Sequence, residues 1–100
     1  MLCLALASPA VAGDDEEARQ LGRKVLAAAA AILDPNLPGA MRAITELGTD
    51  SRYYIMVRGW LDQQLKGDRS IVAAAGAGRN RFIEVRISFL EEAIRAVDLE

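Results

Sequence analysis

At 100 residues, the chain is long enough for one domain and too short for two packed domains. It contains 52% hydrophobic and 26% charged residues, with a single cysteine and no histidine. One cysteine excludes a disulfide scaffold, and the lack of histidine argues against common zinc sites and against hydrolases that need an imidazole base. The net charge of −2 argues against a dedicated nucleic-acid-binding protein. We therefore expect no cofactor, no metal and no catalytic activity.

The N-terminal segment carries no charge, because all 12 basic and all 14 acidic residues lie at or after Asp14. Residues 1–12 are mostly apolar and end with Ala10 and Ala12 at the two positions that a signal peptidase requires to be small. The run is shorter than the roughly 20 residues that cross a bilayer. We predict that residues 1–12 are a signal peptide whose start lies upstream of Met1, since no Lys or Arg precedes them. Residues 13–100 would then form one exported domain, periplasmic, lumenal or secreted.

A first helix is predicted from about Asp15 to Leu33. Its apolar residues recur at spacings of three and four, and acidic residues at 14–17 suit the positive end of a helix. The prolines within 34–39 end this helix, and a second one is expected from Ala40 to Leu47, ended by Gly48. The stripe of the first helix comprises Ala18, Leu21, Val25, Ala28 and Ile32.

A third helix is predicted from Asp50 or Ser51 to Gly67. Aromatic and aliphatic residues repeat at helical spacing along it, from Tyr53 to Leu65. Asp68 is interpreted as the cap of a separate short helix over 69–75, and the glycines at 76–78 as a joint. Asn80 can begin the next helix.

The last segment fits two interpretations. Ile83, Ile87, Leu90, Ile94 and Val97 follow a helical spacing, but residues 82–89 also alternate as a strand does, and 53–57 could be a second short strand. We favour a helix because no turn residue separates 82–89 from the helical pattern over 90–99. The predicted fold is all-α, a small antiparallel bundle of three to four helices, with α+β as the alternative.

The candidate interaction surface runs from Arg52 through Arg69. Residues 52–86 hold seven basic residues against three acidic ones, so an acidic protein surface or anionic membrane headgroups could dock there. Arginine and aromatic side chains are also the usual anchors of protein interfaces. The candidate partner-binding residues are Arg52, Tyr54, Arg58, Trp60 and Arg69. The plainer interpretation is a set of solvated faces, with Asp15/Arg19, Asp62/Lys66 and Glu91/Arg95 as surface pairs.

The function predicted from these features is that of a small exported, non-catalytic helical accessory protein acting through protein–protein contacts. One alternative is a cytoplasmic interaction module that keeps its N-terminus in the core or in a dimer interface. Another is a small enzyme that works without metal or histidine. Association of copies through helix faces is a further expectation, and nucleic acid is not an expected partner.

Overall fold

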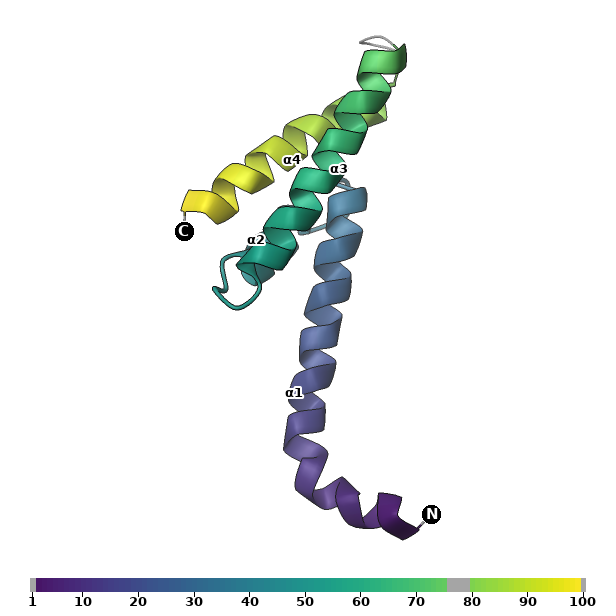
Figure 1. Cartoon of the computed structure of the whole chain (residues 1–100), viewed down its shortest axis with the longest axis vertical. Coiled ribbons are helices and arrows are strands. Elements are labelled where there is room, and N and C mark those ends of the chain that lie inside the picture. The colour runs from purple at the N-terminus through teal and green to yellow at the C-terminus, as the bar shows by residue number, and fades with distance from the viewer. Residues whose placement is uncertain (1, 76–79, 100) are drawn as a thin grey trace.

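Four helices make up the described backbone. The computed structural model describes the backbone of residues 2–75 and 80–99, and the side chains of residues 15–75 and 80–99. The helices are α1 (Leu2–Leu33), α2 (Ala40–Gly48), α3 (Tyr54–Ala75) and α4 (Arg81–Leu99). Consecutive helices alternate in direction (Figure 1), and no strand occurs among these residues. The prediction of a small all-α bundle is confirmed, and the strand alternatives at 53–57 and 82–89 are wrong.

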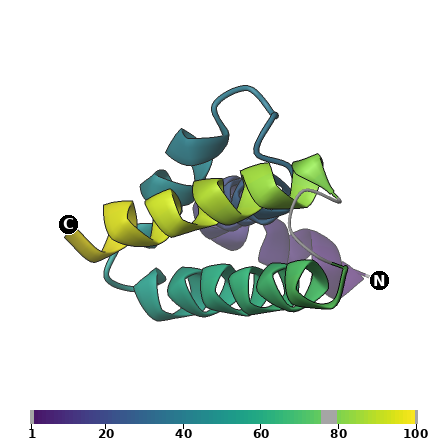
Figure 2. The ribbon, with the colours of Figure 1, turned by 90° about the horizontal axis from the view of Figure 1, so that it is seen from above.

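The core lies where the C-terminal half of α1 meets the other three helices. α3 packs most extensively on α4 and α1 on α2, while α2 also contacts α3 and α4. Seen from above, α3 and α4 run side by side, with α1 nearly end-on beside them (Figure 2). The core consists of aliphatic side chains from all four helices: Ala28, Ala31, Ile32, Ala40, Ile44, Leu47, Val57, Leu61, Leu65, Leu90, Ala93 and Val97.

α1 extends far beyond the rest of the bundle toward the N-terminus (Figure 1). The predicted start near Asp15 is wrong, because the helix begins at Leu2 and carries residues 15–17 in its interior. The side chains of 15–20 are exposed, whereas Ala28 and Ile32 are buried. Only the C-terminal part of α1 therefore contributes to the core. Among the described residues, no helix combines the length and the apolar character that crossing a membrane requires.

The connections use the expected turn chemistry. Asp34 Oδ1 accepts a hydrogen bond from the Asn36 backbone N–H at 3.0 Å, and Gly39 has φ of 71°, a left-handed conformation that favours glycine. At the start of α4, Asn80 Oδ1 accepts from the Ile83 backbone N–H at 3.2 Å, which confirms Asn80 as a cap. The predicted joint at 76–78 lies outside the described residues.

α3 differs from its prediction at both ends. It begins at Tyr54, after a turn in which Asp50 Oδ1 accepts from the Arg52 backbone N–H at 2.9 Å. It then continues through Gly67 to Ala75, so the predicted break at Asp68 is wrong. Asp68 is fully buried, which a solvent-facing cap would not be. Its partners, described below, explain why the helix carries an acid there.

Gly48 lies at the crowded end of α2. A Cβ placed on it would lie 2.6 Å from Val97 Cγ1 and 3.0 Å from Val57 Cγ1. The sequence predicts that this glycine ends the helix. In the structure Gly48 is still helical, and the close approach of α3 and α4 to the backbone of α2 leaves no room for a side chain there.

Candidate functional site

A buried ion pair joins α3 to α4. Arg86 donates from Nε to Asp68 Oδ2 at 2.8 Å and from Nη2 to Asp68 Oδ1 at 2.8 Å. The side chain of Asp68 is 0% exposed and that of Arg86 is 12% exposed. Gln64, one turn earlier on α3, donates to Asp68 Oδ1 at 3.0 Å. Hydrogen bonding to Asp68 raises the pKa of Arg86 above its ordinary value.

The same guanidinium also reaches α1. Arg86 Nη1 donates to the Leu33 carbonyl at 2.7 Å, and Leu33 is the last residue of α1. The final carbonyls of a helix lack partners within the helix, and a cation there also complements the helix dipole. Among the described side chains, every buried polar atom has a hydrogen-bond partner. The Asp68–Arg86 pair thus connects α1, α3 and α4. Because all of its polar atoms are used in these contacts, it is a structural pair and not a binding site.

A second group of polar side chains lies on the exposed seam between α3 and α4. Tyr54 Oη donates to Asp98 Oδ1 at 2.6 Å, and Arg58 Nε donates to the same oxygen at 3.1 Å. The hydrogen bond from Tyr54, aided by Arg58, holds the pKa of Asp98 below its ordinary value. In turn, the hydrogen bond to Asp98 raises the pKa of Tyr54 above 10. This cluster clasps the end of α4 to the start of α3.

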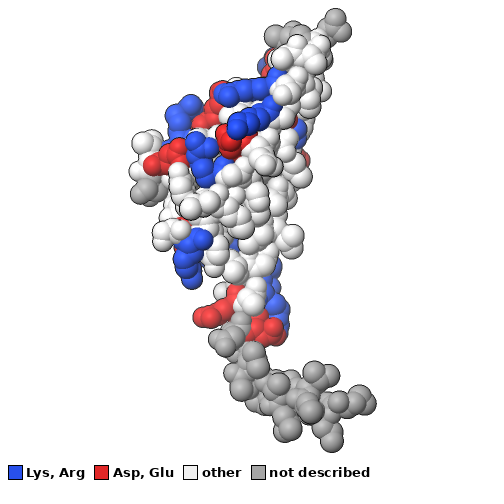
Figure 3. Space-filling view, viewed as in Figure 1, with Lys and Arg blue, Asp and Glu red and all other residues white. Residues whose placement is uncertain are grey.

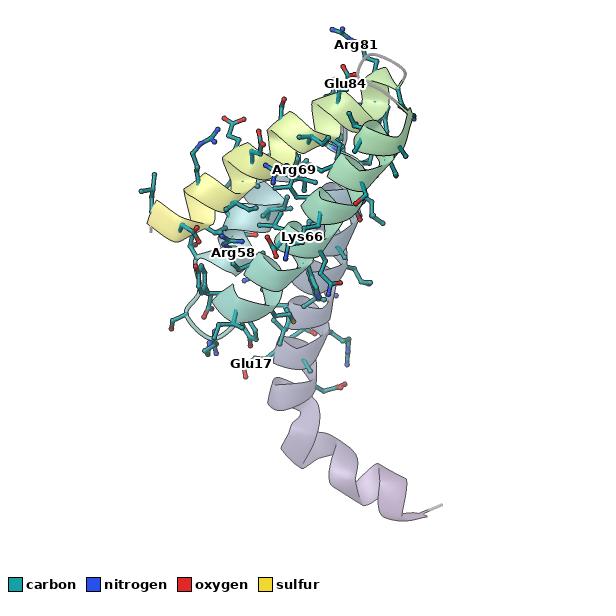
Figure 4. All side chains as sticks on the ribbon, turned by 45° about the horizontal axis from the view of Figure 1, so that its top comes forward. Glu17, Arg58, Lys66, Arg69, Arg81 and Glu84 are labelled. Carbon is teal, nitrogen blue, oxygen red and sulfur yellow. The ribbon has the colours of Figure 1, made fainter. Side chains whose placement is uncertain are left out.

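Further along the seam, Arg69 Nη2 donates to Glu91 Oε2 at 2.6 Å. Figure 4 shows Arg58 and Arg69 in the space between α3 and α4. The predicted pairing of Glu91 with Arg95 on the same helix is therefore wrong, because Glu91 pairs across to α3. We call Tyr54, Arg58, Arg69, Glu91 and Asp98 the α3–α4 seam.

Two predicted pairs within single helices are confirmed. Lys66 Nζ lies 3.1 Å from Asp62 Oδ2, and Arg19 contacts Asp15 on the projecting part of α1. Such exposed pairs contribute little to stability because water competes for both partners.

Acidic side chains from outside residues 52–86 pair with three arginines of that basic stretch. Arg58 and Arg69 meet acids from α4, and Arg52 makes a bidentate contact with Asp50 at 2.9 and 3.1 Å. The side-chain and backbone hydrogen bonds from Arg52 lower the pKa of Asp50 to about 2. Part of the local positive charge that the sequence predicts is thus offset in the folded chain.

The structure brings some of the predicted partner-binding residues together and separates another. Tyr54, Arg58 and Arg69 lie on the seam, and Arg52 precedes it in the α2–α3 turn. Trp60 points to the opposite flank of α3, where it lines a hollow with Ala29 and Leu33 of α1. Trp60 therefore does not share a surface with the four others.

Sequence reasoning missed Ile55. This side chain is 81% exposed, three residues from Arg52 and three from Arg58. Val57 and Leu61 fix the direction of the core, and Ile55, two residues before Val57, lies on the opposite side of the helix, which could have indicated an exposed aliphatic residue. Single exposed apolar side chains are common on protein surfaces, so Ile55 is a candidate contact residue only through the two arginines near it in the sequence.

Charged side chains gather in two places on the face shown in Figure 3, along α4 and its border with α3, and around α1 where it leaves the bundle. The described residues contain no group of three or more His, Cys, Asp or Glu side chains that could hold a metal ion. No protein-family model, curated protein or solved structure matches the chain.

Proposed function

We propose that the chain is a small exported, non-catalytic accessory protein that binds a protein partner through the α3–α4 seam and the adjoining Arg52 and Ile55. The observation that carries the proposal is the exposure of Ile55, which lies three residues from Arg52 and three from Arg58 in the sequence. An aliphatic side chain in that setting gains free energy when a partner removes it from water. The arginines beside it supply orientation and specificity.

Arg52 and Arg69 are suited to exchange partners. Their side chains are 73% and 55% exposed, and the acids they contact, Asp50 and Glu91, are 31% and 39% exposed. Exposed ion pairs of this kind are weak in water, so a carboxylate from another protein can replace an intramolecular one at little cost. The surface can therefore bind without unfolding.

The chemistry of the expected partner follows from these groups. It offers an apolar hollow for Ile55 and carboxylates for Arg52 and Arg69. Because the seam is electrically balanced, a structured protein surface is favoured over anionic headgroups, which attract an excess of positive charge.

Export is part of the same proposal. It is supported by the uncharged run over 1–12 and its Ala10–Ala12 ending. We expect the chain recovered from its native cells to have a mass that corresponds to a start at Gly13. A recovered chain that retains residues 1–12 would instead support the cytoplasmic alternative.

The binding surface is tested by affinity capture from native cells with the wild-type chain, the Ile55→Glu variant and a Val85→Glu control. Val85 is also exposed but lies on α4, outside the seam. We expect a specific partner whose recovery falls at least tenfold for Ile55→Glu and is unchanged for Val85→Glu, with equal melting temperatures for all three chains. If no captured protein depends on Ile55, the proposed surface is wrong.

Arg58→Glu is a poor substitute for this test. It would place a third carboxylate beside Asp62 and Asp98, which Arg58 now contacts at 3.8 and 3.1 Å. The resulting repulsion would disturb the seam itself. Ile55 has no comparable intramolecular role.

A further inference from the structure

An uncharged groove runs between α1 and α3, on the flank of α3 that faces away from the seam. Its volume is about 390 Å³, and its walls are apolar or amide side chains. We call it the α1–α3 groove; its lining residues are Ala29, Ile32, Leu33, Trp60, Gln63, Gln64 and Gly67.

Large apolar side chains of α1 stand open beside this groove. Leu26 is 71% exposed and Leu33 is 55% exposed, and with Ala29 they lie on one face of the helix at spacings of three and four. The neighbouring face, with Ala28 and Ile32, is buried in the core of the same chain. A helix that is apolar on both faces is normally covered on both. Here the bundle covers one face and leaves the other open.

We propose that a second copy of this chain covers the open face of α1. In this dimer the two α1 helices pack antiparallel, and Leu26 of each copy occupies the α1–α3 groove of the other, between Leu33 and Trp60. Each copy thus carries both the protruding side chain and the groove that receives it, which is the condition for a closed two-fold interface.

The charges along α1 select the antiparallel arrangement. Residues 25–33 are uncharged, with Arg23 and Lys24 immediately before them and Asp34 immediately after. Two parallel copies would place Arg23 and Lys24 beside their own counterparts. Antiparallel copies, related by an axis near Ala29, bring these cations to Asp34 and to the negative carboxyl end of the other α1.

Arg23 is available for this contact. Its side chain is 64% exposed, and its Nη2 lies 3.7 Å from Glu16 Oε2 in a loose ion pair. The complementary ends therefore require no buried pair to be broken. This interface lies on the opposite flank of α3 from the proposed partner surface, so the dimer and the partner binding can be tested independently.

Sedimentation equilibrium of the full chain tests the dimer. We expect the wild-type chain to dimerise and Leu26→Glu to raise the dissociation constant at least about a hundredfold, because the change places two carboxylates in apolar grooves. Ile55→Glu is the matched control, since it places the same charge at a similarly exposed position. It should leave the dissociation constant and the helical circular dichroism unchanged. A monomeric wild-type chain, or equal association of wild-type and Leu26→Glu chains, overturns the proposal.

Disulfide cross-linking in a Cys3→Ser background tests the orientation. Ala30→Cys lies close to the proposed axis and should cross-link two copies. Gly22→Cys should not, because antiparallel packing separates the two Gly22 positions by about 20 Å, well beyond disulfide reach. A Cβ at Gly22 meets no atom within 4 Å, so the substitution itself is tolerated. Efficient cross-linking through Gly22→Cys would overturn the antiparallel arrangement.

Discussion

Helix α3 forms acid–arginine contacts with α4 in two different surroundings. Near the C-terminal end of α3, Asp68 and Arg86 are enclosed in the core, and each polar atom has a fixed partner. At the exposed seam, Arg58 and Arg69 meet acids of α4 in contact with water. The removal of one partner therefore has different consequences. Loss of an enclosed partner strands a charge, while loss of an exposed partner returns the other to solvent.

The largest expected effect comes from Asp68→Ala. It leaves the Arg86 guanidinium enclosed without its counter-ion, and we expect the free energy of unfolding to fall by about 3–5 kcal/mol. Urea unfolding followed by circular dichroism measures the change. For a domain of this size, such a loss is a large part of the total stability.

Asp62→Ala is the matched control, because Asp62 is an acid of the same helix that pairs with Lys66 at the surface. Its effect should stay below about 1 kcal/mol. A double variant, Asp68→Leu with Arg86→Leu, should recover much of the stability lost in Asp68→Ala. Equal effects of Asp68→Ala and Asp62→Ala would contradict the distinction between enclosed and exposed acids on α3.

Two glycines extend the comparison to packing. Gly48→Ala should lower the free energy of unfolding by about 1–3 kcal/mol, because its Cβ would overlap Val97. Gly59→Ala should raise it by about 0.5–1 kcal/mol, because the site is open and helical and alanine costs less backbone entropy. Thermal melts of the two variants measure both. Shifts of the same sign would contradict the assigned packing.

The smallest expected effect is on proton binding at the seam. A raised Tyr54 pKa stabilises the fold below pH 10, and this contribution is lost as pH rises through the folded value. A lowered Asp98 pKa stabilises the fold above the unfolded value, and this contribution is lost as pH falls through the folded value. Both contributions are small because the seam is open to water.

Tyrosinate absorbance measures the first of these shifts, with Tyr54→Phe identifying the signal. Asp98→Asn should lower the pKa of Tyr54 toward its ordinary value, because the hydroxyl then no longer donates to a carboxylate. Asp62→Asn should leave the tyrosine titration as it is in the wild-type chain. An unchanged pKa in Asp98→Asn would show that the two groups do not interact in solution.

The helices themselves could be predicted because their signals are local. The spacing of apolar residues identifies α4 despite the strand-like alternation over 82–89, and Asn80 marks its start. The C-terminal end of α3 is harder to predict from the sequence, because Gly67 and Asp68 resemble a helix end when considered alone. Tertiary contacts override that local preference once Asp68 has a buried partner.

The sequence contains a pattern from which the Asp68–Arg86 pair could be predicted. Asp68 continues the buried stripe of Val57, Leu61 and Leu65, and Arg86 lies at helical spacing between Ile83 and Leu90. Opposite charges on the buried stripes of two helices indicate a pair in the core. The seam could not be predicted in the same way, because the contacts of Arg58 and Arg69 depend on how α4 lies across α3.

The hydrogen bond from Arg86 to Leu33 has a consequence for the order in which the chain is made. It joins residues 53 positions apart, so the Leu33 carbonyl gains its side-chain partner only after most of the protein has been synthesised. A nascent chain that stops before α4 lacks both this bond and the counter-ion of Asp68. We therefore expect α1 to α3 to become stably folded only once the last helix has been synthesised.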